Sequence, residues 1–266
     1  MKTIRDIRCF LLDMDGTIYL GNKLIKGADK FIETLINSKR EFFFFTNNSS
    51  KNPEKYRNKL AKMGIKIQEN RIITSGDVTI DYLKQERDNP LVYLVGTPSL
   101  EEQFIRNGIT LTTNISEKID YLVVSFDTTL NYQKLWDAHD LILKGIRYVA
   151  TNPDYVCPLA GGKTMPDCGS IISLLKTSTG REPYVIGKPN SIMLDYIEKR
   201  TGLKRNDIAM VGDRLYTDIQ TAINAGIISI LVLSGETRKE DLNEFEGKID
   251  FIINSIEELL YLLTKN

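Results

Sequence analysis

Short apolar runs recur along the chain and alternate with amphipathic stretches. The runs lack the apolar–polar alternation of a half-exposed strand, and nearly continuous hydrophobicity is typical of parallel strands covered on both faces. We therefore predict buried strands at residues 9–13, 42–46, 184–187, 208–212, 228–233 and 251–253.

The stretches between these runs carry apolar residues at helical spacing. Asn52 followed by Pro53 is typical of a helix start, and Ser255 with Glu258 has the spacing of a capping box. We predict helices at residues 28–39, 53–63, 191–201, 217–225 and 256–265. The alternation of strands and helices indicates an α/β fold, doubly wound around a mostly parallel, Rossmann-like sheet.

The middle of the chain repeats this alternation between two turn-rich segments, residues 88–90 and 179–183. A single core seldom grows beyond roughly 250 residues. We therefore interpret residues 89–182 as a second α/β domain, inserted into a core made of residues 1–88 and 183–266. One continuous large sheet is the alternative. Strands are expected at 92–96, 121–126 and 148–151, and helices at 100–107, 132–144 and 170–178.

Composition restricts the class of partner. Lys plus Arg and Asp plus Glu both number 35, so the chain lacks the basic excess of nucleic-acid or membrane-surface proteins. No signal peptide or bilayer-spanning run is apparent. The three cysteines have no CxxC spacing and are expected to be reduced thiols. We expect a soluble, cytoplasmic protein that binds a small molecule rather than nucleic acid or membrane; a homodimer is possible.

The sequence DMDGT follows the first predicted strand and places Asp13 and Asp15 beyond its carboxyl end. Ligands of open parallel sheets bind at this edge. Two converging carboxylates repel each other unless a cation joins them, and Mg²⁺ prefers oxygen ligands. One carboxylate can attack phosphorus while the other transfers protons. A solvated acidic turn is the alternative.

Three further polar clusters follow other predicted strands. Thr46 and Asn47 precede a helix and can bind an anion, although such residues are also common in turns. Lys188 can hold a phosphoryl group, although a lone lysine is usually solvated. Asp213 can complete a metal site. Asp218 can orient Lys188 or a metal-bound water, or it is a carboxylate that the helix dipole stabilises in the first helical turn. We expect all four clusters to meet at one edge of one sheet.

These motifs, FLLDMDGT, FFFFTNN, GKP and GDRLYTD, resemble in that order the four motifs of the haloacid dehalogenase superfamily. The insertion between the second and third motifs resembles the cap domain of the NagD-type, 4-nitrophenylphosphatase-like branch. The segment ATNPD with Pro158, and Gly161 with Gly162, also resemble that branch.

The resemblance implies an Mg²⁺-dependent phosphatase that forms an aspartyl phosphate, with a cap that closes over the site and selects a small phosphomonoester. It implies a role for each motif residue: Asp13 as nucleophile and metal ligand, Asp15 as acid, base and metal ligand, Thr46 and Asn47 as phosphoryl ligands, Lys188 as the neutralising cation, Asp213 as metal ligand and Asp218 as its support. Asn152 and Asp154 are candidates for contacts near the leaving group, or form an ordinary turn.

Other functions use similar residues. A receiver domain accepts phosphate on an aspartate without hydrolytic turnover, but it is about half as long and needs no insertion. A phosphomutase would reuse the phospho-aspartate and require a sugar bisphosphate. A Ser-His-Asp hydrolase is poorly supported, since GxSxG is absent and His139 lies in an amphipathic helix.

Overall fold

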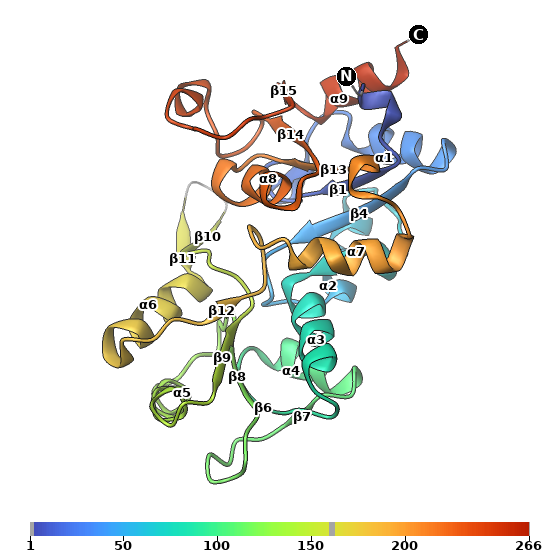
Figure 1. The fold of residues 1–266 in the computed structure, drawn as a ribbon. Coiled ribbons are helices and arrows are strands. Elements are labelled where there is room, and N and C mark those ends of the chain that lie inside the picture. Colours follow the sequence, from blue (N-terminus) through green and yellow to red (C-terminus); the bar gives the residue numbers. More distant parts are fainter. Residues whose placement is uncertain (1–2, 160–162, 266) are drawn as a thin grey trace. The chain divides into compact units, whose positions relative to one another are not determined.

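The computed structural model describes residues 3–159 and 163–265, and the chain divides into two units. The core unit contains residues 1–46, 54–73 and 188–266, and the inserted unit contains residues 47–53 and 74–187. Residues 47–53, 74–88 and 183–187 thus group with the inserted unit, whereas the sequence boundaries place them in the core domain. Figure 1 shows the elements of each unit.

The core unit is built on a six-stranded sheet in the order β15-β14-β13-β1-β4-β5 (Figure 1). β1 pairs in parallel with β13 and β4, and the pairs β13–β14 and β14–β15 are also parallel. The mostly parallel α/β fold is therefore confirmed. The strands are β1 (Cys9–Leu12), β4 (Glu41–Thr46), β5 (Ile72–Thr74), β13 (Ile208–Gly212), β14 (Ile228–Val232) and β15 (Phe251–Ile253).

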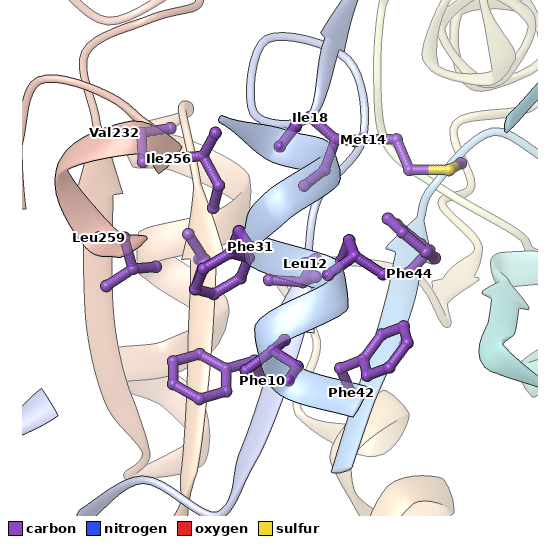
Figure 2. Close-up of a cluster of buried hydrophobic side chains, with 14 of the residues drawn as sticks. Phe10, Leu12, Met14, Ile18, Phe31, Phe42, Phe44, Val232, Ile256 and Leu259 are labelled. Carbon is purple, nitrogen blue, oxygen red and sulfur yellow. The ribbon is translucent and has the colours of Figure 1, made fainter. Parts of the chain in front are cut away.

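Alternate residues of β1 and β4 form a hydrophobic cluster with helices α1 (Ala28–Asn37) and α9 (Ile256–Thr264). Figure 2 shows Phe10 and Leu12 of β1 between side chains of these elements. The rings of Phe10 and Phe31 meet edge to face, with centroids 5.6 Å apart. Full burial of each such side chain contributes roughly 1.5–3 kcal/mol. The core unit also contains helices α2 (Pro53–Lys62), α7 (Ile192–Thr201) and α8 (Gln220–Ala225) and the β2–β3 hairpin (Tyr19–Leu20, Lys23–Leu24). It has short 3₁₀ turns at Ile4–Asp6, Glu69–Arg71, Arg205–Asp207 and Lys239–Asn243.

The inserted unit has its own five-stranded sheet in the order β12-β9-β8-β6-β7, and its strand pairs are parallel. Its elements are α3 (Ser75–Glu86), β6 (Leu91–Val95), α4 (Pro98–Arg106), β7 (Thr110–Leu111), β8 (Tyr121–Val124), α5 (Tyr132–Leu143), β9 (Arg147–Ala150), the antiparallel pair β10 (Val156–Pro158) and β11 (Thr164–Pro166), α6 (Cys168–Thr179) and β12 (Tyr184–Val185).

The position of β12 corrects one sequence expectation. The run at residues 184–187 was expected to be a core strand with Lys188 at its end, but β12 pairs with β9 of the inserted unit. Only two residues of this run pair, and so short a run carries no periodicity that could assign it to a sheet. The expectation that every motif follows a strand of one sheet is therefore wrong for Lys188.

Two helix starts also differ from the sequence expectation. The stretch at 217–225 begins as a π-helical turn, Leu215–Ile219, before α8. At α9, the Ser255 side chain makes no capping bond; the Glu258 carboxylate instead accepts from the backbone and side-chain nitrogens of Asn254, at 2.8 and 2.7 Å. Both differences arise from local hydrogen bonds that spacing alone does not specify.

None of the helices within residues 3–159 and 163–265 is both long and apolar enough to cross a bilayer.

We expect the three cysteine thiols to differ in reactivity. Burial, with a smaller contribution from Glu41, raises the pKa of Cys9 to about 12, and burial also raises the pKa of Cys168. A raised pKa leaves little thiolate, the reactive form, at pH 8. Cys157 is only partly buried. Iodoacetamide should therefore label native protein at Cys157 alone and label all three cysteines in denaturant, as measured by mass spectrometry; rapid native labelling of Cys9 would contradict this burial.

Candidate active site

Two aspartates meet at the carboxyl edge of the core sheet. Asp13 follows β1 and Asp213 follows β13, and these strands are neighbours paired in register, with Leu12 beside Val211. The backbone N–H of Asp13 donates to the carbonyl of Val211 at 2.9 Å and extends this pairing. Carboxylate oxygens of Asp13, Asp213 and Asp218 lie within 4.8 Å of one another. The sheet register therefore brings together Asp13 and Asp213, two of the predicted metal ligands, and Asp218 joins them from the turn Leu215–Ile219.

Lys188 is buried inside this cluster. Its Nζ donates to Oδ1 of Asp13 at 2.7 Å, to Oδ1 of Asp218 at 2.6 Å and to the carbonyl of Phe45 at 3.1 Å. The side chain of Lys188 is 3% exposed and that of Asp218 is fully buried. Burial alone would lower the pKa of Lys188, but the two carboxylates outweigh it and raise the pKa. The lysine therefore stays charged at the site.

Asp13 and Asp213 both have raised pKa values. Burial raises the pKa of Asp13 well above its ordinary value, Lys188 opposes this, and the neighbouring Asp218 and Asp213 add to it. Burial, followed by Asp218, raises the pKa of Asp213 to about 7, although the Glu236 N–H opposes the change. A second cation beside these groups would favour their ionised forms.

A loop after β14 holds Asp213. The backbone N–H of Glu236 donates to Oδ2 of Asp213 at 2.6 Å, and the Ser234 hydroxyl donates to the carbonyl of Gly16 at 2.8 Å. A Cβ at Gly235 or Gly16 would overlap the Asp213 carboxylate, and Gly16 also has a φ of +90°. Two glycines thus let the backbone approach this carboxylate closely.

The residues fit a magnesium ion. Oδ1 of Asp213 is buried and, within the described residues, has no hydrogen-bond partner. Lys188 pairs with two of the three carboxylates, Asp13 and Asp218. A divalent cation would balance the remaining negative charge beside Asp213, and Mg²⁺ takes such oxygens. Asp218 is less suited to bind it, because Oδ1 accepts from Lys188 and Oδ2 accepts from the Arg214 N–H at 3.1 Å. Asp218 instead positions Lys188, one of the two roles expected for it.

The side chains that brace this loop were not among the predicted site residues. Glu236 pairs with Arg214 at 2.9 Å and accepts from the Tyr216 hydroxyl at 2.9 Å. The signal was present, because the sequence SGET follows a buried parallel strand at its carboxyl end.

The inserted unit contains a second polar cluster. Nδ2 of Asn47 and Nδ2 of Asn152 donate to Oδ2 of Asp154 at 2.7 and 3.1 Å. Asn152 also donates to Oδ1 of Asp167 at 3.0 Å, and Asp167 caps the start of α6. All four side chains are buried. The structure thus brings three predicted residues, Asn47, Asn152 and Asp154, into one hydrogen-bonded network.

Two predicted residues lie at the edges of core elements. Thr46 ends β4 and is 8% exposed, whereas Asp15 is exposed and forms a backbone bridge with Tyr19. The expected Gly161 and Gly162 signature lies outside the described residues.

Comparison with known proteins identifies the family. The model of the haloacid dehalogenase-like hydrolases matches residues 10–110, and an HAD-hydrolase-like model matches residues 185–259. An acid sugar phosphatase of Staphylococcus haemolyticus is 34% identical over 263 residues, covering 99% of both chains. The chain belongs to the haloacid dehalogenase superfamily of hydrolases.

Solved structures agree and refine the class. A 4-nitrophenylphosphatase of Thermotoga maritima superposes with a TM-score of 0.93 at 41% identity, covering 99% of this chain and 100% of that one. A glycerol phosphate phosphatase of Mycobacterium tuberculosis, solved with magnesium, gives 0.90 at 28% identity and covers 97% and 78%. Within its superfamily the chain is a NagD-type phosphatase, and phosphatases of this superfamily use Mg²⁺.

Replacing Gly235 by alanine should weaken magnesium binding. The added Cβ would displace the Asp213 carboxylate, and changes that move a metal ligand typically cost about 10- to 100-fold in affinity. The Mg²⁺ concentration that half-activates hydrolysis of 4-nitrophenyl phosphate should rise by that factor.

Gly202→Ala is the matched control, because a Cβ there meets open space at φ +67°. It should lower stability by about 1 kcal/mol and leave magnesium activation unchanged. Equal activation constants for Gly235→Ala and wild type would contradict the steric argument.

Replacing Asp154 by alanine should destabilise the protein. The buried amides of Asn47 and Asn152 would lose a shared acceptor, at a cost of about 1–3 kcal/mol in urea unfolding. Exposed Asp88→Ala should change stability by less than about 0.5 kcal/mol. Unchanged stability together with a lower kcat/KM would instead favour the predicted contact near the leaving group.

Proposed function

We propose that this phosphatase hydrolyses a small phosphorylated metabolite through an aspartyl phosphate formed on Asp13. The observation that carries the proposal is the contact of Asp13 with the buried, charged Lys188, beside an Asp213 oxygen that is buried without a hydrogen-bond partner in the described residues. A nucleophile, a fixed cation and a candidate metal ligand are what phosphoryl transfer to a carboxylate requires.

The first step transfers the phosphoryl group to the enzyme. Lys188 binds Oδ1 of Asp13, so we assign the attack on phosphorus to Oδ2. As this bond forms, the bond from phosphorus to the leaving oxygen breaks, and Asp15 gives its proton to that oxygen. Lys188 neutralises charge on the transferred group. Its contacts with Asp218 and the Phe45 carbonyl keep it in place.

The second step releases phosphate. A water molecule attacks phosphorus, Asp15 takes its proton, and the bond to Asp13 breaks. Asp15 is exposed and therefore accessible to water. Asp13 and Asp213, with the backbone carbonyl of Asp15, would hold Mg²⁺. When bound, the ion supplies positive charge to the phosphoryl oxygens.

Four further side chains and the inserted unit also have predicted roles in binding the substrate. Thr46 and Asn47 are assigned to the phosphoryl oxygens, Asn152 and Asp154 to the leaving group, and the inserted unit to substrate selection. Free, reduced thiols support a cytoplasmic location, and a homodimer is also compatible with the chain.

The substrate class follows from what the relatives share. One is named for sugar phosphates, one for 4-nitrophenyl phosphate and one for glycerol phosphate. The common chemistry is a monoester of phosphate on a small organic group. A screen of sugar, polyol and nucleoside monophosphates with and without Mg²⁺ tests this class.

Asp13→Asn should abolish turnover while leaving the fold intact. An amide oxygen is a poor nucleophile, and loss of the nucleophile should lower kcat by at least about 1,000-fold. Acid-quenched wild type should carry phosphate on Asp13, detected by mass spectrometry of the peptide, whereas the variant should carry none.

Asp29→Asn, on the exposed first turn of α1, provides the matched control. It should retain wild-type kcat. Substantial hydrolysis by Asp13→Asn would refute the assigned nucleophile. A phosphorylated but non-hydrolysing wild type would favour a receiver-like module, and an absolute requirement for a sugar bisphosphate would favour a phosphomutase.

A further inference from the structure

The core unit has a recess at the opposite edge of its sheet from Asp13. This pocket has a volume of about 780 Å³ and is lined by residues that precede β1, β4 and β5 and by the end of α7. We call it the amino-edge pocket. Its cationic side chains are Arg5, Arg8, Lys39, Arg40, Arg71 and Arg200.

The amino-edge pocket is separate from the phosphatase site. Arg8 immediately precedes β1 and Asp13 immediately follows it. The four residues of β1 lie between them, so five steps of extended chain separate these positions by about 16 Å.

The charge of the lining is strongly one-sided. Among the described residues that line it, Glu41 is the one acidic residue, and its carboxylate pairs with Arg71. Cations gathered on one concave surface repel one another and attract anions. The net charge of the whole chain is zero, so this concentration is local.

Several of the guanidinium groups are already fixed in place. Arg40 donates from Nε to the carbonyl of Ile7 at 3.1 Å and from Nη2 to the carbonyl of Arg5 at 2.9 Å. The guanidinium groups of Arg71 and Arg200 lie 5.5 and 5.1 Å from the ring centroid of Phe43, which is buried. A ligand would therefore meet pre-positioned donors, which lowers the entropic cost of binding.

We propose that the amino-edge pocket binds a polyphosphate group, either as inorganic polyphosphate or carried by a nucleotide. Guanidinium groups match phosphate oxygens with paired donors. The volume is that of a small-molecule site, which typically measures roughly 300–1,000 Å³. A single phosphate would reach few of the cations, because they come from four separate chain segments. A chain of linked phosphates can contact several of them at once.

Calorimetric titration of the Mg²⁺-loaded enzyme with inorganic tripolyphosphate tests this site. Wild type should bind it at least about tenfold more tightly than orthophosphate. Arg8→Gln/Lys39→Gln should weaken tripolyphosphate binding at least about tenfold, because it removes two lining charges. The matched control Lys30→Gln/Lys62→Gln, which removes two exposed charges elsewhere on the core unit, should bind as wild type does.

Hydrolysis of 4-nitrophenyl phosphate tests whether the pocket and control variants are folded. Each of them should hydrolyse it at the wild-type rate. A second pair, Arg5→Gln/Arg200→Gln, should reproduce the loss of binding if the first pair is poorly folded. Equal affinity in pocket and control variants, or no binding at all, would overturn the proposal.

ATP in place of tripolyphosphate distinguishes the sources: tighter ATP binding assigns a nucleotide, and weaker ATP binding assigns inorganic polyphosphate. Asp13→Asn should leave this binding unchanged, so its outcome is independent of the proposed hydrolysis.

Discussion

The buried ammonium of Lys188 is the constraint on which the site depends. Bringing a charged lysine out of water costs several kcal/mol unless nearby groups compensate it. Asp13 and Asp218 supply that compensation from two different elements. The same contacts that make the lysine tolerable in the interior also fix its distance from Asp13. Stability and chemistry therefore impose the same geometry on these side chains.

The two edges of the core sheet carry opposite charges. Carboxylates gather where β1 and β13 end, and cations gather where β1, β4 and β5 begin. The strands between them are apolar and buried, so the two groups of charges stay at opposite edges of the sheet. A parallel sheet aligns all strand ends in this way, and the loops at each edge are free to carry one chemical character. The architecture thus supports two ligand sites within one unit.

Sequence patterns predicted most core elements because buried parallel strands are nearly all apolar. β1, β4, β13, β14 and β15 were predicted within one or two residues, whereas β5 and α3 were missed. The run at residues 184–187 has the same composition but pairs with another sheet, and pairing partners are not encoded in one strand's own residues.

Asp13 and Asp213 could be predicted because strand ends are visible in sequence. Lys188 was predicted from the order of the motifs, although the strand before it pairs with another sheet. Glu236, Gly235 and Arg214 were missed although the sequence SGET follows a strand, because a strand end does not show which residues will contact Asp213. The Glu236 N–H binds Asp213, the Glu236 side chain pairs with Arg214, and Gly235 leaves room for the Asp213 carboxylate only once the loop after β14 folds back.

The order in which the chain is synthesised has a consequence for how the core unit forms. β1 and β4 are synthesised before most of the inserted unit, but β13, which lies beside β1 in the sheet, begins only after it, at residue 208. The inserted unit is nearly continuous in sequence, so it can fold during translation while the apolar strands of the core still lack their partners. Those strands are prone to aggregate until β13 has been synthesised, because unpaired strands template contacts with other chains.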